Sequence, residues 1–99
     1  MKLVRDRIPE IIIEDGGKPV YHLADIDEYR RELYKKVIEE LNEFREEPCL
    51  EEAADLLEAV YTLFDTHKFE LIDIAEVGMI KYSIVGGFSR GVILETVDD

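Results

Sequence analysis

The spacing of apolar residues along the chain predicts helices over most of its length. Apolar side chains recur every three or four positions from Ile26 to Arg45 and from Leu50 to Thr66, which is the period of an amphipathic helix. A further stretch, from Leu71 to Val85, is apolar almost all round. A shorter segment from Arg5 to Asp15 is rich in isoleucine, and its Pro9 is tolerated in a first helical turn. We therefore predict four helices and an all-α fold.

Helix-breaking and capping residues separate these stretches. The pairs Gly16-Gly17 and Gly86-Gly87 are typical of residues that follow a helix end. Glu46-Glu47-Pro48 interrupts the pattern between the two long amphipathic stretches, so that one helix can turn back on the other. Asp25 precedes Glu28 by three residues, an acidic variant of the capping box, and predicts a helix start at Ile26.

Two short segments have the composition of extended chain. Lys18 to Leu23 contains proline, valine and tyrosine, and Gly91 to Val97 contains valine, isoleucine and threonine. We predict that these two segments pair in a small β-hairpin-like arrangement beside the helices.

The two C-terminal helical stretches carry more apolar surface than so short a chain is expected to cover alone. A chain of 99 residues makes one domain, here predicted to span residues 1–99, and it buries only a modest core. A helical bundle assembled from two chains would cover the remaining apolar surface. We therefore predict a bundle completed by oligomerisation, as a homodimer or homotetramer, with a tightly packed monomer as the alternative.

Four acidic residues form two pairs in which both carboxylates share one helix face. The pairs are Glu40 with Glu43 and Glu52 with Asp55, and within each pair the residues are three positions apart. Eight residues separate the pairs along the chain. If the two helices turn back on each other, the four carboxylates converge and repel one another unless a cation lies among them.

Helical projection places some of these acids among the apolar residues. At about 100° per residue, Glu40 falls within the apolar stripe and Glu43 at its edge, whereas Glu39 falls with the solvent-facing charges. On the next helix Glu52 falls within the stripe and Asp55 borders it. A buried carboxylate without a partner is costly, and ligand sets made only of oxygen suit Mg²⁺ or Mn²⁺. The pattern favours a metal site over the alternative, in which these acids pair with Lys or Arg at the edge of the core.

Three basic residues are candidates to bind an anionic substrate. Lys81 falls within the apolar arc of the last helix, so it extends its amine to solvent, reaches the acids as a counter-ion or holds a phosphate. Arg5 and Arg7 lie close to the N-terminus and are possible phosphate clamps. Surface ion pairs with Asp6 or Glu10 are the alternative for these two arginines.

Charge and composition narrow the choice of partner and compartment. The net charge of −12 argues against a nucleic acid polymer or an anionic membrane surface as partner. No apolar run is long enough to span a membrane, and the opening residues lack the apolar core of a secretory signal. The single cysteine, Cys49, is typical of a reducing compartment, so we expect a cytoplasmic protein.

The acidic pairs resemble the metal-binding signature of a known superfamily, the all-α nucleoside triphosphate pyrophosphohydrolases. This superfamily contains the MazG-like proteins, the dimeric dUTPases and the phosphoribosyl-ATP pyrophosphohydrolases. The opening segment Lys2 to Ile12 looks like the start of one short MazG-like subgroup, and the final segment looks like its end. That final segment contains Lys81, Gly86-Gly87-Phe88 and Ile93-Leu94. The resemblance covers essentially the whole chain in order.

This resemblance implies Mg²⁺-dependent cleavage between the α- and β-phosphates of a nucleotide, which yields a monophosphate and pyrophosphate. It implies that Lys81 steadies the phosphates and that one carboxylate takes a proton from the attacking water. The residues that would bind the metal, and carry the catalysis, are Glu40, Glu43, Glu52 and Asp55.

The sequence departs from the MazG-like pattern near its last helix. Gly78, Val85 and Gly91 stand where related proteins often carry Arg or Lys. Two alternatives therefore remain beside a housekeeping nucleotide pyrophosphohydrolase. One is phosphoribosyl-ATP cleavage in histidine biosynthesis, and the other is a catalytically weak oligomeric module for binding or regulation.

Overall fold

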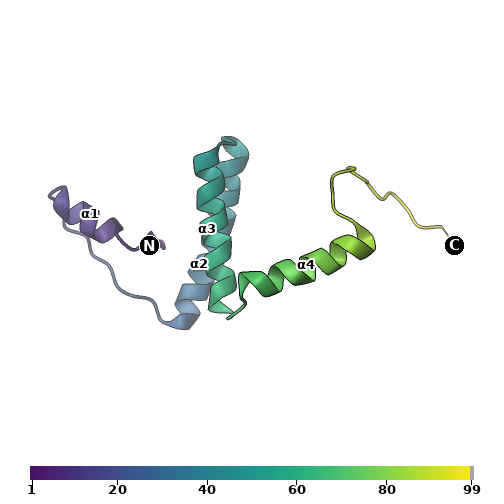
Figure 1. Cartoon of the computed structure of the whole chain (residues 1–99). Coiled ribbons are helices and arrows are strands. Elements are labelled where there is room, and N and C mark those ends of the chain that lie inside the picture. Colours follow the sequence, from purple (N-terminus) through teal and green to yellow (C-terminus); the bar gives the residue numbers. More distant parts are fainter. Residues whose placement is uncertain (99) are drawn as a thin grey trace. The chain divides into compact units, whose positions relative to one another are not determined.

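The computed structural model describes residues 1–98 and contains four helices over that range (Figure 1). The helices are α1 (Ile8–Glu14), α2 (Ile26–Glu46), α3 (Leu50–Thr66) and α4 (Leu71–Val85). The all-α prediction is confirmed, and the predicted bounds of α3 and α4 are those observed. Helix α2 runs one residue further than predicted, and α1 is shorter at both ends.

Local chemistry accounts for where these helices begin and end. The side chain of Asp25 accepts a hydrogen bond of 2.9 Å from the backbone N–H of Glu28, which confirms the predicted cap of α2. Pro9 lies in the first turn of α1, where a backbone N–H has no partner within the helix. Gly86 follows α4 with a φ of 80°, a conformation that a residue with a side chain adopts only with strain.

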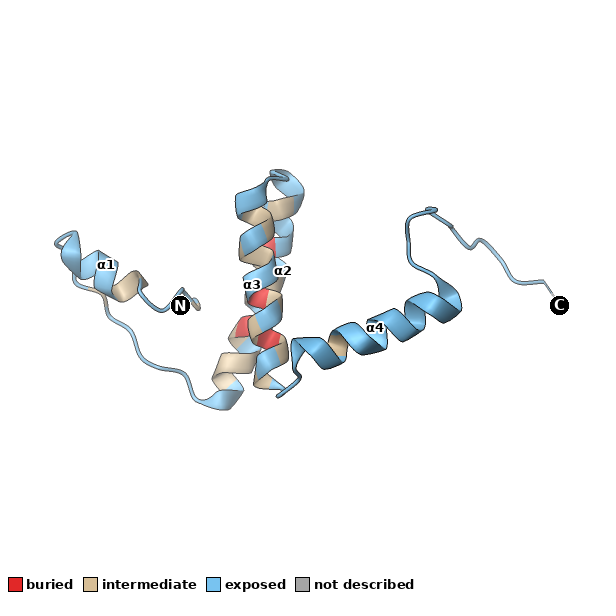
Figure 2. Cartoon of the chain, in the orientation of Figure 1, coloured by how far each residue is buried: buried red, intermediate tan, exposed pale blue. Residues whose placement is uncertain are grey.

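Helices α2 and α3 form an antiparallel pair that contains the buried residues of the described chain (Figures 1 and 2). The apolar members of this core are Leu33 on α2 and Ala59 and Leu63 on α3. Glu40 is buried with them and is only 6% exposed. The projected apolar stripes therefore face each other, and an acid lies in the seam between them.

The predicted β-hairpin-like pairing is wrong for the part of the chain that the structure describes. Residues 18–23 and 91–97 are both irregular, and no strand forms among residues 1–98. Pro19 offers no N–H to a ladder, and an isolated pair of short strands is marginally stable without a layer to cover it. Val20 is fully exposed and Leu23 is 90% exposed, so neither side chain finds such a layer.

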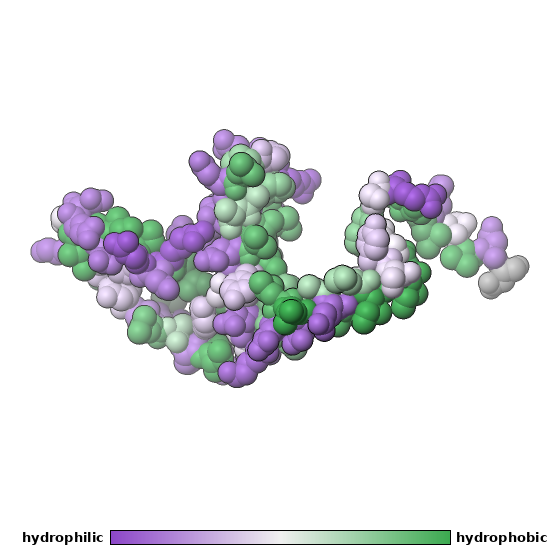
Figure 3. Space-filling view, viewed as in Figure 1, coloured by the Kyte–Doolittle hydropathy of each residue, from purple (hydrophilic) through white to green (hydrophobic). Residues whose placement is uncertain are grey.

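Backbone contacts divide the chain into two compact units, Met1–Lys68 and a second unit that begins at Phe69. The second unit contains α4, on which every residue except Ile74 is exposed. Hydrophobic residues cover much of the visible surface of this helix (Figure 3). Its large exposed apolar residues are Leu71, Ile72, Val77, Met79, Ile80, Tyr82, Ile84 and Val85. The single-domain and oligomer predictions remain predictions.

Within residues 1–98 no helix is both long enough and apolar enough to cross a membrane.

Candidate metal centre

Three of the four predicted ligands meet between α2 and α3. One carboxylate oxygen from each of Glu40, Glu52 and Asp55 lies within 4.8 Å of the corresponding oxygens of the other two. The antiparallel turn after α2 brings the last turns of α2 beside the first turns of α3, which carry the second acidic pair. Glu43, one turn beyond Glu40, is exposed and lies outside this group of three, which we call the acidic cluster.

The buried carboxylate of Glu40 is only half satisfied. Its Oε1 accepts a charged contact of 3.3 Å from Nζ of Lys36, one turn earlier on α2. Its Oε2 is buried and has no hydrogen-bond partner among the described residues, and the same is true of Oε2 of Glu52. Buried acceptors without partners are rare, because no hydrogen bond offsets the free energy lost when water is removed from them. These two oxygens therefore suit a cation that the chain itself does not supply.

The surroundings of Glu40 and Glu52 raise the pKa values of both carboxyl groups. Burial is the main cause that raises the pKa of Glu40, and the charges of Glu43 and Asp55 act in the same direction. The contact with Lys36 opposes this rise without cancelling it. Burial and the neighbouring charges of Asp55 and Glu40 likewise raise the pKa of Glu52. Burial and the neighbouring acids therefore disfavour the charged forms of Glu40 and Glu52, although Lys36 is close.

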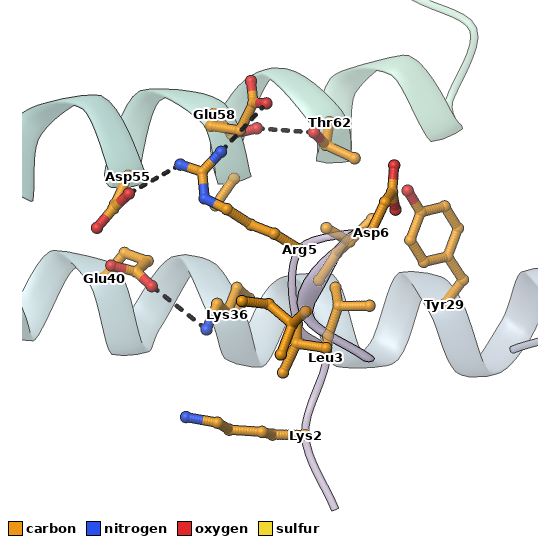
Figure 4. A pocket seen from close by; sticks show the side chains of 14 residues that line it. Lys2, Leu3, Arg5, Asp6, Tyr29, Lys36, Glu40, Asp55, Glu58 and Thr62 are labelled. Atoms are coloured by element: carbon orange, nitrogen blue, oxygen red, sulfur yellow. Dashed lines mark hydrogen bonds and ion pairs between the residues drawn. The ribbon is translucent and has the colours of Figure 1, made fainter. Parts of the chain in front are cut away.

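Arg5 reaches the acidic cluster from the N-terminal segment (Figure 4). Its Nη2 donates a hydrogen bond of 2.8 Å to Oδ1 of Asp55, and its Nη1 lies 3.7 Å from Oε1 of Glu58. The hydrogen bond to Asp55, helped by the nearby charges of Asp55, Glu58 and Glu40, raises the pKa of Arg5. The alternative of a local pair with Asp6 or Glu10 is wrong for Arg5, which pairs instead with an acid fifty positions away.

The other two basic candidates are not brought to the cluster by contacts within the first unit. Nε of Arg7 lies 3.1 Å from Oε2 of Glu10, which is the local surface pair considered as the alternative for this residue. Lys81 is an exposed residue of α4, in the second unit, so its approach to the acids remains a prediction. Gly78 and Val85 also lie on α4, and Gly91 follows it with a φ of 63°.

Two residues of the site were missed from the sequence. Lys36 precedes Glu40 by four positions, a spacing that places both on one helix face and could have identified the pair. Glu58 follows Asp55 by three positions and extends the acidic face of α3 in the same way. Both were overlooked because charged residues at helical spacing are common on solvated faces.

A cavity of about 540 Å³ adjoins the acidic cluster. The N-terminal segment forms one wall, with Leu3 and Arg5 among its lining residues, while α2 and α3 form the others. In Figure 4 the guanidinium of Arg5 projects from that segment toward Asp55 and Glu58 on α3, and Glu40 faces Asp55 from α2. The space is therefore bordered by both acidic and basic side chains.

The donor set defines the chemistry that the site can support. A donor set made only of oxygens suits hard divalent cations such as Mg²⁺ and Mn²⁺, and oxygens of three carboxylates converge here. The two buried oxygens without partners fit such an ion. Comparison of the chain with protein-family models, with curated proteins and with solved structures finds no match.

Proposed function

We propose that this chain is a Mg²⁺-dependent nucleotide pyrophosphohydrolase with a housekeeping role. It would convert a nucleoside triphosphate or a related nucleotide to the monophosphate and pyrophosphate. The observation that carries the proposal is the convergence of Glu40, Glu52 and Asp55, with a buried Glu40 oxygen that has no partner. The resemblance of the two acidic pairs to the pyrophosphohydrolase signature supplies the reaction.

In this proposal the acidic residues bind the metal ion and accept a proton from the attacking water. Glu40, Glu52 and Asp55 would hold Mg²⁺ or Mn²⁺, and Glu43 would join them as the fourth carboxylate of the pattern. When bound, the ion neutralises phosphate charge and makes a water molecule more acidic. A carboxylate oxygen not engaged with the ion takes the proton as the water oxygen attacks the α-phosphorus. The α–β anhydride bond breaks, and its electron pair leaves with pyrophosphate.

Basic residues would hold the phosphates in this proposal. Arg5 lines the cavity beside the acidic cluster and carries the planar, multiple N–H donors that suit phosphate oxygens. Lys81 is proposed as a second phosphate contact on the resemblance alone. Arg7 is engaged by Glu10 and is assigned no role at the phosphates.

We also propose that the protein acts as a homo-oligomer in the cytoplasm. Helix α4 exposes apolar side chains along its whole length, and a second copy of the chain would cover part of that surface. The one cysteine, Cys49, is exposed and free, which fits a reducing compartment.

Pyrophosphate release from a panel of nucleotides tests the function. The panel contains the common ribo- and deoxyribonucleoside triphosphates and phosphoribosyl-ATP, each with Mg²⁺ and with excess chelator. We expect a monophosphate and pyrophosphate, in equal amounts, only when the metal is present. Activity confined to phosphoribosyl-ATP would assign the chain to histidine biosynthesis. If no substrate releases pyrophosphate, the chain is a binding or regulatory module and not an enzyme. The absence of basic side chains at Gly78, Val85 and Gly91 favours that alternative.

A further inference from the structure

A protein cation already occupies one of the three converging acids. Nη2 of Arg5 is 2.8 Å from Oδ1 of Asp55, so a metal ion bound by this carboxylate would lie beside a positively charged guanidinium. Both side chains are substantially exposed, at 58% and 41%. Exposed pairs of this kind contribute little free energy because water and salt screen them. Arg5 would therefore leave Asp55 readily if several carboxylates together held a divalent ion, because the two positive charges repel each other.

Glu58 provides a second position for the displaced guanidinium. Its Oε1 lies 3.7 Å from Nη1 of Arg5, and it stands one turn beyond Asp55 on the same face of α3. Glu58 does not belong to the acidic cluster, so a metal ion there leaves it free to hold Arg5. The N-terminal segment and the cavity that it lines would then stay together when the Asp55 pair opens.

We propose that Arg5 exchanges partners when the metal binds, an inference that rests on the proposed function. In the metal-free protein Arg5 neutralises Asp55, and in the metal-bound protein Glu58 alone retains it beside the cavity. The N–H groups released from Asp55 then receive a phosphate group of the substrate, for which a guanidinium is well shaped. Arg5 is thus both the resident counter-ion of the site and its phosphate receptor, and Glu58 is the residue that positions it.

Metal affinity tests the first half of the exchange. Mn²⁺ alone is titrated calorimetrically into the wild-type protein and into the Arg5→Gln and Arg7→Gln variants. Because the metal no longer competes with an arginine, Arg5→Gln is expected to bind Mn²⁺ about two- to fivefold more tightly. Arg7→Gln, the matched control, keeps the wild-type affinity. If wild-type protein binds Mn²⁺ and Arg5→Gln binds it equally or more weakly, the exchange is wrong and the metal centre stands. If wild-type protein binds no Mn²⁺, the metal centre and the exchange both fail.

Hydrogen exchange of the N-terminal segment tests the role of Glu58 without any catalytic readout. In Glu58→Gln, the peptide covering residues 1–11, whose Ile8 and Ile11 amides donate to the carbonyls of Arg5 and Arg7, should exchange as in wild type while metal is absent, because Asp55 holds Arg5. Addition of Mn²⁺ should then speed its exchange in the variant and not in wild type. Equal exchange rates of this peptide in the two proteins with Mn²⁺ would show that Glu58 does not hold Arg5.

Binding of magnesium pyrophosphate tests the phosphate receptor. Arg5→Gln should weaken its binding about tenfold or more, since a charge-assisted contact is lost, while Arg7→Gln should not. Unchanged binding in Arg5→Gln would show that Arg5 only neutralises Asp55.

Discussion

At the scale of single residues, Glu40 is a core position of the α2–α3 pair and also a proposed metal ligand. It occupies a place in the seam where an apolar residue would pack better, and it carries an oxygen without a partner. Such a residue weakens the metal-free fold, because a charge buried without full compensation is costly. Its presence in the core is explained if a cation completes it.

Replacement of Glu40 by Gln is expected to stabilise the metal-free protein at neutral pH, by roughly 1 kcal/mol. The pKa of Glu40 is raised in the folded state, so folding binds a proton between its ordinary pKa of 4.5 and the raised value. The contribution of Glu40 to stability therefore falls as pH rises through that window. Denaturant unfolding in chelator should show that the advantage of Glu40→Gln grows with pH across the same window.

Glu32→Gln is the control with the opposite sign. The contact with Lys35 lowers the pKa of Glu32, so its charged form favours the folded state above its ordinary pKa. Its replacement should leave stability unchanged or slightly lower at neutral pH. A stabilisation equal to that of Glu40→Gln would mean that relief of net negative charge, and not the buried position, is the cause.

Asp55→Asn tests the acidic cluster in catalysis. The change keeps the size of the side chain but removes a charge from the proposed metal ligands, so turnover should fall by about two orders of magnitude or more. Asp65→Asn is the matched control on the same helix, since Asp65 is exposed and lies nearly three turns from Asp55. Steady-state pyrophosphate release, with circular dichroism as a check on folding, measures both variants. Equal losses in the two variants would place the site elsewhere.

At the scale of helices and segments, periodicity predicted more than composition did. The bounds of α3 and α4 and the cap at Asp25 followed from apolar spacing and from side-chain chemistry that acts within a few residues. The burial of Glu40 followed from projection alone. The two extended segments were predicted from valine, isoleucine and tyrosine content, but a strand also needs a partner and a covering layer, which composition does not provide. The pair between Arg5 and Asp55 joins distant parts of the chain, and no local pattern predicts it.

Mg²⁺ is expected to join α2 and α3 more tightly, since the acidic cluster draws ligands from both. At a hundred times its dissociation constant, the ion would add about 2.7 kcal/mol of stability to the folded state. Thermal unfolding with and without Mg²⁺ measures this gain, and Glu40→Gln should lose most of it. If Mg²⁺ does not move the wild-type midpoint, the acids are a solvated face and not a metal site.

At the scale of the whole molecule, much apolar surface is exposed, above all on α4. The four most buried residues all lie on α2 and α3, and α4 has no buried residue in the described chain. A helix that is apolar almost all round is normally buried against other parts of its protein or against a partner. The homo-oligomer prediction follows from this exposure, because a second copy is a partner that is always present.

Light scattering at micromolar concentration tests this prediction. We expect a mass of at least twice the 11.5 kDa of one chain. Ile80→Glu places a charge on an exposed apolar position of α4 and should shift the distribution toward monomer, while the neighbouring Glu76→Gln should not. A monomeric wild-type protein would show that α4 is not an assembly surface.

The location of Glu40 in the core has a consequence for the lifetime of the protein. Glu40 lies both in the α2–α3 seam and among the residues proposed to hold the ion, so the seam would open most often in protein without metal. Proteases attack the opened form in proportion to its population. Magnesium-starved molecules would therefore be degraded first, and the pool that survives would be enriched in molecules that hold the ion. Pulse proteolysis in chelator and in Mg²⁺ would measure this selection directly.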